Sequence, residues 1–181
     1  MGSLEASETV DASSTYEDTL PTRSGEIIGL LEQLGVSLDI HHHAPLRTVA
    51  DSQHLRGEID GAHIKNLYLR DNKKNNYLVV ADETLAIDLK ELAPKIGANR
   101  LSFGSADRLM EFLGVRPGAV SPLTLVNDPD NKVQLVMDAA LLEAEKINVH
   151  PLVNDMTVSM AVEGLDVFLD HTGHKSRRIL I

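Results

Sequence analysis

The sequence contains no cysteine and no tryptophan, and only 3% of its 181 residues are aromatic. Without cysteine the chain can form no disulfide, no cysteine nucleophile and no cysteine-bound zinc site. The hydrophobic core must therefore be built from aliphatic side chains. A hydrophobic content of 43% is ordinary for a globular domain.

Long apolar runs are also missing. No stretch approaches the roughly 20 residues that a bilayer-spanning helix requires. The N-terminus lacks the basic region followed by an apolar region that marks a signal peptide. We therefore expect a soluble cytoplasmic protein without a membrane partner, and 181 residues suit one domain with a full core.

Basic residues are outnumbered, because 17 Lys and Arg stand against 27 Asp and Glu, which gives a net charge of −10. Residues 1–22 contain acidic but no basic residues, and we predict a disordered acidic tail there. One domain is expected over residues 23–181. The negative charge argues against extensive nucleic-acid binding, so any nucleic acid must be held through a small basic patch.

Helical and strand-like patterns alternate along this domain. Helical spacing of apolar residues is strongest over 25–34, 85–96 and 105–113, and each stretch stops before or at a glycine. Strand patterns at 62–70 and 77–81 are joined by a polar turn and predict a hairpin. Shorter segments predict strands at 38–40, 100–103, 123–126, 132–137, 157–161 and 178–181, and helices at 139–145 and 162–171. Hairpins together with crossovers indicate an α+β fold with a mixed sheet.

Residues 61–71 place a lysine inside an otherwise apolar strand, since Lys65 and Asn66 precede the apolar residues 67–69. A lysine at such a place must reach water, pair with an anion or lose its hydration. Two interpretations stay open. Lys65 can lie on the solvated face of an edge strand, or it can be a cation held on a rigid strand to meet a phosphate or a carbonyl oxygen.

The densest histidine cluster is at positions 41–43. In a strand, His41 and His43 share one face, so a metal site with two protein ligands is one interpretation. Nothing in the sequence fixes further ligands, and an edge strand of mixed packing is the other interpretation. The Asp-Pro-Asp stretch at 128–130 lacks the glycine and the distal glutamate of a calcium loop, which excludes that site.

Two loops carry polar groups that could serve a reaction. His150 precedes a proline, and its imidazole can orient water or hold a ribose hydroxyl, or it can be a structural turn residue. The Gly-Ala-Val-Ser-Pro loop at 118–122 offers backbone N–H groups to an oxyanion, or it is only a tight loop. The sequence has no phosphate loop, no nucleophile elbow and no dinucleotide-binding glycine triplet.

Taken together, five blocks resemble the YbaK and prolyl-tRNA-synthetase editing-domain superfamily, in particular its freestanding aminoacyl-tRNA deacylases. The resemblance covers about residues 24–181. It is most similar to the ProX-like branch, which clears alanine from mischarged proline tRNA, and the branch that clears cysteine is its close neighbour. The blocks are HAPLRT (43–48), KNLYLRD (65–71), RLSF (100–103), LGVRPGAVSP (113–122) and HPLVN (150–154) with Thr157.

The resemblance implies a single α+β domain with a mixed, largely antiparallel, curved sheet flanked by helices. It implies hydrolysis of the ester bond of Ala-tRNA(Pro), with Lys65 and His150 as catalytic residues and with no metal or cofactor. The implied substrate-binding residues are Thr48, Asn66, Gly118, Ala119, Ser121 and Asn154.

The implied partner is a tRNA acceptor end with its attached amino acid, and prolyl-tRNA synthetase is a second candidate. Monomer and homodimer both stay open. Editing is needed because one missing methylene is worth only about 1–3 kcal/mol, so a proline site cannot strongly reject alanine. Lys65, Arg70, Lys73, Lys74 and Arg116 would supply the basic rim. The alternatives are the same chemistry on Cys-tRNA(Pro) or another small aminoacyl-tRNA, and a non-catalytic module that binds tRNA or a synthetase.

Overall fold

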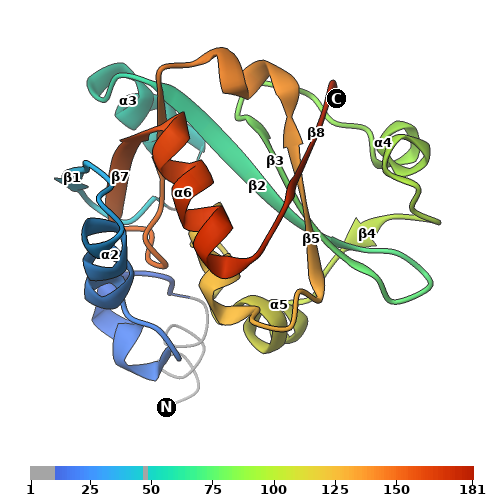
Figure 1. The fold of residues 1–181 in the computed structure, drawn as a ribbon, viewed down its shortest axis with the longest axis horizontal. Helices are drawn as coiled ribbons and strands as arrows, with labels where there is room; N and C mark the ends of the chain where they lie inside the picture. The colour runs from blue at the N-terminus through green and yellow to red at the C-terminus, as the bar shows by residue number, and fades with distance from the viewer. Residues whose placement is uncertain (1–10, 47–48) are drawn as a thin grey trace.

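A computed structural model describes residues 11–46 and 49–181 of the chain. In this part, eight strands form one sheet that runs through the molecule (Figure 1). The strands are β1 (Asp39–His42), β2 (Ala62–Arg70), β3 (Asn76–Asp82), β4 (Ser102–Phe103), β5 (Val133–Asp138), β6 (Lys146–Val149), β7 (Met156–Ala161) and β8 (Ser176–Ile179). Their order in the sheet is β1-β7-β6-β2-β3-β5-β8, and β4 pairs with β2.

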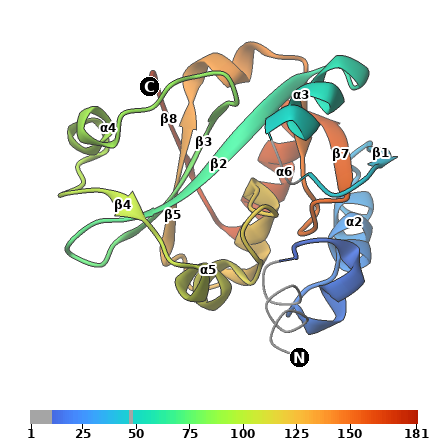
Figure 2. The same cartoon turned by 180° about the vertical axis from the view of Figure 1, so that it is seen from behind.

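The helices flank this sheet. They are α2 (Ser24–Gln33), α3 (Val49–Glu58), α4 (Leu89–Ile96), α5 (Ala106–Leu113) and α6 (Val162–Thr172), with 3₁₀ helices η1 (Ser14–Thr19), η2 (Pro122–Asn127) and η3 (Ala139–Glu143). Viewed from behind, α4 and α2 lie at opposite ends of the molecule (Figure 2). Within the described residues, none of the helices combines the length and the apolar character needed to cross a bilayer.

The predicted mixed sheet is confirmed. Among the described strands, antiparallel pairs join β1 to β7, β7 to β6, β2 to β3 and β2 to β4. Parallel pairs join β2 to β6, β3 to β5 and β5 to β8. The predicted hairpin is the β2–β3 pair, whose register runs from Ile64 opposite Asp82 to Arg70 opposite Asn76. β2 is the shared strand, because its first residues pair with β6 and its last residues pair with β4.

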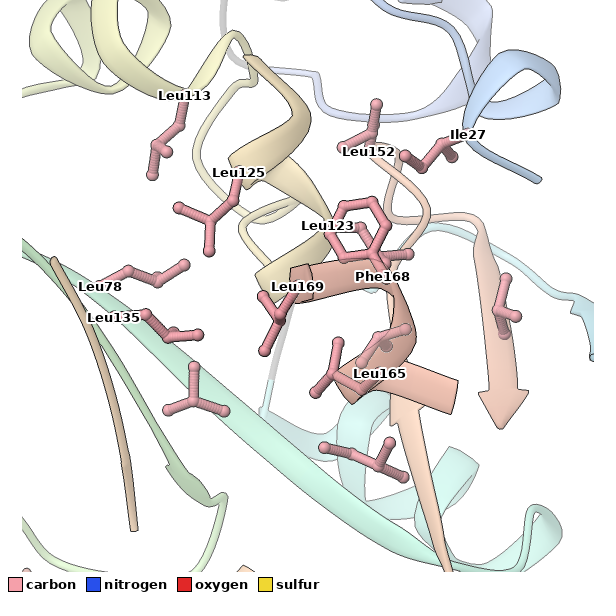
Figure 3. Packing of buried hydrophobic residues seen from close by; sticks show 14 of the residues in the cluster. Ile27, Leu78, Leu113, Leu123, Leu125, Leu135, Leu152, Leu165, Phe168 and Leu169 are labelled. Atoms are coloured by element: carbon pink, nitrogen blue, oxygen red, sulfur yellow. The ribbon is translucent and has the colours of Figure 1, made fainter. Parts of the chain in front are cut away.

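Alternate residues of β2 enter two different hydrophobic clusters. Tyr68 belongs to the larger cluster, which also holds Leu78 of β3 and Phe168 of α6 (Figure 3). Leu69 belongs to the smaller cluster, which includes Leu92 of α4. Both faces of the sheet are therefore covered at this strand, which makes β2 a rigid support for the polar residues at its start.

Local signals set the ends of α4 and α5, although α4 begins at Leu89 and not at residue 85 as predicted. The Asp88 carboxylate accepts the Lys90 N–H at 2.8 Å at the start of α4, and Ser105 Oγ accepts the Arg108 N–H at 3.1 Å at the start of α5. Both helices end at a glycine in the left-handed conformation. A side-chain cap at the start and a glycine at the end satisfy groups that the helix itself leaves unpaired.

The segment predicted as a strand at 123–126 instead lies in the 3₁₀ helix η2. Ser121 Oγ accepts the Leu123 N–H at 3.2 Å, and the Thr124 hydroxyl donates to the Ser121 carbonyl at 2.6 Å. Leu123 and Leu125 are fully buried. A short apolar run does not distinguish a buried strand from a buried helical turn, and here the serine cap decides for the turn.

The N-terminal segment (residues 11–22) packs against the domain, which differs from the disorder predicted over 1–22. It contains η1, and Ala12 and Ser13 are only 6% and 4% exposed. The prediction relied on the scarcity of large apolar residues. Small side chains can also be buried when the backbone finds hydrogen-bond partners. Residues 1–10 lie outside the described part of the chain.

A buried pair locks two turns at one end of the sheet. His174 Nε2 lies 2.9 Å from Asp128 Oδ2, and the two side chains are 2% and 4% exposed. The same carboxylate accepts the backbone N–H groups of Lys132 and Val133, each at 2.9 Å. Asp128 therefore ties the turn before β5 to the turn before β8.

We predict that Asp128→Ala lowers the free energy of unfolding by about 3–5 kcal/mol, because it leaves buried donors without their acceptor. Urea denaturation monitored by circular dichroism measures this difference. The matched control is Asp130→Ala in the same turn, whose side chain is exposed and whose effect should stay within about 0.5 kcal/mol. Equal midpoints for the two variants would contradict the role of Asp128.

Candidate active site

A small cavity lies where β2 and β6 separate. The two strands pair only through Ala62 with Ile147 and His63 with Asn148. Beyond these pairs the chains part, and side chains from both sides line the space between them. The cavity has a volume of about 60 Å³, which holds a few water molecules or one small group. Its lining residues are Leu46, Leu55, His63, Ile64, Asn66, Glu83, Asn148, Val149, His150 and Thr157.

His150 forms one wall, and its backbone contacts fix its tautomer. Its Nδ1 lies 2.9 Å from the Met156 carbonyl oxygen, which can only accept, so Nδ1 carries the proton. The His150 carbonyl in turn accepts the Ser121 hydroxyl at 2.7 Å. In the neutral ring, Nε2 is therefore a proton acceptor.

The surroundings of His150 favour this neutral ring. Burial lowers the pKa of His150 below its usual 6.5, and the nearby His43 and His63 act in the same direction. The hydrogen bond to Met156 and the Asp155 carboxylate oppose the shift without cancelling it. An imidazole of lowered pKa stays unprotonated near pH 7, which is what a group that accepts a proton from water requires.

A second imidazole stands beside the cavity. His43 Nδ1 lies 2.8 Å from the Ala44 carbonyl oxygen, so it donates, and His43 Nε2 accepts the Thr157 hydroxyl at 2.8 Å. The ring centroids of His43 and His150 are 6.3 Å apart. Because the Thr157 proton points to His43, the hydroxyl oxygen of Thr157 keeps its acceptor capacity for the cavity that it lines.

Asn66 lines the cavity and has an unpaired acceptor in its side chain. Its Oδ1 is buried and has no hydrogen-bond partner among the described residues, and the residue lines the cavity. An unpaired buried acceptor costs about 1–3 kcal/mol. An N–H or O–H group of a bound molecule at this place would remove that cost.

His63, Asn148 and Glu83 also line the cavity, and they were not among the predicted site residues. His63 Nε2 donates to the Ile59 carbonyl at 2.7 Å, and Asn148 Nδ2 donates to the Asp60 carbonyl at 3.0 Å. A single histidine or asparagine in a strand is usually structural. Only the β2–β6 register, which the sequence does not encode locally, brings these residues together.

Lys65 neighbours the cavity but does not line it. Its side chain alternates with that of Asn66 and shares a strand face with Leu67 and Leu69, which pack in the smaller cluster. Its ammonium donates to the Leu85 carbonyl. Glu83, two residues earlier in the same turn, lines the cavity. Lys65 thus lies across the 83–85 turn from the cavity, with its ammonium bound to a carbonyl oxygen.

Ala119 and Ser121, two of the predicted substrate-binding residues, lie behind the cavity wall in the 118–122 loop. Ala119 and Ser121 are fully buried, and neither lines the cavity. The Ala119 N–H donates to the Arg116 carbonyl at 3.1 Å, so it is not available to an ester oxygen. Ser121 supports His150 through its carbonyl instead of contacting a substrate.

Gly118 and Asn154 do not line the cavity. Gly118 is exposed, and a Cβ atom placed on it would lie 3.6 Å from Asn154 Nδ2 and 3.8 Å from Ala12 Cβ. Asn154 Nδ2 donates to the carbonyl of Leu46 at 3.3 Å. Asn154 therefore holds a residue of the cavity wall. Thr48, also predicted to bind substrate, lies outside the described residues.

The histidines at 41–43 are engaged with the neighbouring strand. His41 Nε2 lies 3.2 Å from Ser159 Oγ, and His43 bonds Thr157 as described above. Both partners lie on β7, which pairs with β1. In the described part of the chain, no three histidine, aspartate or glutamate residues are grouped as a metal site would need.

The domain thus combines a mixed α+β sheet with a small polar cavity where two of its strands separate. Residues 43–168 match the family model described as the aminoacyl-tRNA editing domain. The match spans more than half of the chain. This protein therefore belongs to the aminoacyl-tRNA editing domain family.

Named relatives agree with the family. The chain is 37% identical over 154 residues to the prolyl-tRNA editing protein ProX of Acetoanaerobium sticklandii, covering 84% of this chain and 94% of that protein. It is 34% identical over 149 residues to prolyl-tRNA synthetase associated domain-containing protein 1 of Mus musculus, covering 80% and 88%. The resemblance seen in the sequence blocks is thus confirmed.

The fold also matches solved structures. One crystal structure, of a candidate trans-editing enzyme for prolyl tRNA synthetase, gives a TM-score of 0.65 at 20% identity. The alignment covers 88% of this chain and 98% of that chain. At this identity the likeness supports the fold alone.

We predict that His150 makes the protein less stable in mild acid. The unfolded chain binds more protons than the folded chain between the lowered pKa of His150 and 6.5. This component of stability is complete above about pH 6.5 and is lost as the pH falls toward the folded pKa. Wild type should therefore lose more free energy of unfolding between about pH 7.5 and about pH 5.5 than His150→Gln does.

Urea unfolding at the two pH values measures this difference, and the other titrating groups contribute equally to both proteins. An NMR titration of the His150 ring gives the folded pKa directly. Identical losses in wild type and His150→Gln would contradict a buried neutral imidazole.

Proposed function

We propose that this protein is a trans-editing hydrolase that deacylates mischarged Ala-tRNA(Pro) by ester hydrolysis. The observation that carries the proposal is the buried, unpaired Asn66 Oδ1 in a small cavity whose other wall is the neutral His150. The family supplies the substrate class, aminoacyl-tRNA. The names of the two relatives point to prolyl-tRNA as the carrier.

The cavity suits the aminoacyl group. The α-ammonium of an aminoacyl ester is a cluster of donors, and Asn66 with the Thr157 hydroxyl oxygen supplies acceptors in the cavity lining. Leu46 and Ile64 offer apolar contact to a methyl group. A volume of about 60 Å³ favours alanine over the larger proline ring, which is the second sieve that a proline synthetase site needs.

The reaction needs one oriented water molecule. In the proposed step, His150 Nε2 accepts a proton from water as the water oxygen bonds to the ester carbonyl carbon. The bond between that carbon and the ribose oxygen then breaks, and the ribose oxygen takes the proton. Alanine and free tRNA are released. The ester is already reactive, so positioning and modest electrostatic help suffice.

Lys65 would hold the nucleotide end of the substrate. An ammonium has three donors, and Leu85 uses one of them, so two remain for a phosphate oxygen. Arg70, Lys73 and Lys74 at the far end of the β2–β3 hairpin extend this positive region. Arg116, also predicted for the rim, donates from its guanidinium to Thr19 and to the Asp11 carbonyl.

We predict that purified protein deacylates Ala-tRNA(Pro) at least about tenfold faster than Pro-tRNA(Pro), because the proline side chain is larger than that of alanine by more than one methylene. The assay follows release of radiolabelled amino acid from tRNA(Pro) charged with Ala, Cys, Ser or Pro. Asn66→Leu should abolish the activity, since it replaces the unpaired acceptor with an apolar side chain.

The same assay separates the alternatives. Fastest release of cysteine would assign the Cys-tRNA(Pro) reaction instead. Tight binding of all four charged tRNAs without release would leave a non-catalytic binding module.

We predict that Lys65→Ala lowers the deacylation rate by about 10²-fold, the cost of removing one positioned charged donor. Circular dichroism should show an unchanged fold, because Lys65 is only partly buried. The matched control is Lys95→Ala, an exposed lysine on α4, which should keep the wild-type rate. Equal rates for the two variants would remove Lys65 from the mechanism.

A further inference from the structure

The N-terminal segment crosses behind the candidate active site and bonds directly to residues 154 and 155. The Asn154 N–H donates to the Ala12 carbonyl at 2.9 Å. Both oxygens of the Asp155 carboxylate accept from Ser14, one from its N–H at 3.0 Å and one from its hydroxyl at 2.5 Å. A stretch of loop is thus held by a segment more than 130 residues earlier in the chain.

Residues 154–156 in turn hold three residues at or beside the cavity. The Asn154 carbonyl accepts the Leu46 N–H at 3.2 Å, and the Asp155 carbonyl accepts the His43 N–H at 3.1 Å. The Met156 carbonyl accepts Nδ1–H of His150 at 2.9 Å. Three consecutive carbonyl groups therefore fix the positions of Leu46, His43 and His150.

This loop needs support from outside. Leu152 has a φ of 71°, a left-handed conformation that a branched side chain rarely adopts. Such a conformation persists only where the surroundings hold it in place. Leu152 is fully buried and points toward Ile27 of α2, next to the N-terminal segment (Figure 3). Packing on one side and the hydrogen bonds from Ser14 on the other hold the strained turn.

Arg116 anchors the segment at further points. Its guanidinium donates to Thr19 Oγ1 at 2.7 Å and to the Asp11 carbonyl at 3.3 Å. It also lies over the Tyr16 ring, 5.7 Å from the centroid. The side chain thus bridges both ends of η1, and the segment is attached to the domain on either side of Ser14.

From these contacts we infer that Ala12 and Ser14 are positioning residues of the active site, acting through residues 154–156 on His43 and His150. The inference rests on the proposed function of the cavity. No residue of the segment lines the cavity, so the segment should affect the orientation of His150 more than the binding of substrate. Its loss should therefore lower kcat and leave KM nearly unchanged.

Two variants of the full chain remove the Ser14 contacts without changing charge. Ser14→Ala removes the hydroxyl, and Ser14→Pro removes the hydroxyl and the N–H. Proline fits here because Ser14 is the first residue of η1 and Ser13 is already extended, with φ −77° and ψ 168°. The matched control is Thr15→Ala, on the exposed side of the same helix.

Two measurements decide the proposal. Steady-state deacylation of Ala-tRNA(Pro) should show kcat reduced about tenfold in Ser14→Pro and less in Ser14→Ala, with KM within about twofold and Thr15→Ala like wild type. Two-dimensional NMR of the free protein should show altered His150 and His43 ring signals in Ser14→Pro, smaller changes in Ser14→Ala and none in Thr15→Ala. The titratable groups that face His150 and can influence its ring signals are His43, His63 and Asp155.

If Ser14→Pro keeps both the kcat and the His150 signals of Thr15→Ala, the positioning role is wrong. A lower Tm with unchanged kcat and ring signals would also overturn it, since that is the mark of a merely structural contact. If wild type releases none of the four amino acids, the proposed function fails. In that event the NMR comparison alone decides whether the N-terminal segment orients His150.

Discussion

β2 and β6 pair through two residues on each strand and then separate, and the candidate active site exists because of that separation. Where the strands are paired, His63 and Asn148 direct their side-chain donors to nearby carbonyl groups. Just beyond, Asn66 and His150 face a space that no strand fills. The parallel pairing of β2 with β6 is short. Polar groups therefore lie at a rigid position in the sheet, and the hydrophobic core stays covered.

The chemistry of the site follows from neutral groups. His150 loses its charge through burial, and its proton is bound to Nδ1 by the Met156 carbonyl. Thr157 gives its proton to His43, so it faces the cavity as an acceptor. Acceptors on several sides favour a ligand rich in N–H and O–H groups. An aminoacyl ester on a ribose has that composition.

Local sequence signals predicted much of the fold. The β2–β3 hairpin, the capped helices α4 and α5, and the positions of Asn66 and His150 near one site all depend on short-range patterns or on a family resemblance. The sequence did not reveal three contacts. The Lys65 ammonium donates to the Leu85 carbonyl, and the Ala119 N–H donates to the Arg116 carbonyl. The Ser14 hydroxyl donates to the Asp155 carboxylate. Each of these depends on tertiary contacts across many residues, which periodicity and capping signals do not encode. The strand predicted at 123–126 was wrong for a related reason, because the Ser121 hydroxyl caps the 3₁₀ helix η2 there.

The two ends of the sheet have a consequence for association between molecules. Among residues 11–46 and 49–181, β1 and β8 each pair on one side only, and each has four residues. Free strand edges can recruit a strand from another molecule, and short, charged edges discourage this. On β8, Arg177 reaches back to the Ile96 carbonyl at 2.8 Å and Arg178 to the Asp166 carboxylate at 2.5 Å. The two arginines thus bind α4 and α6, and they place positive charge on a short edge strand, which is a feature that discourages sheet growth between molecules with an aliphatic interior.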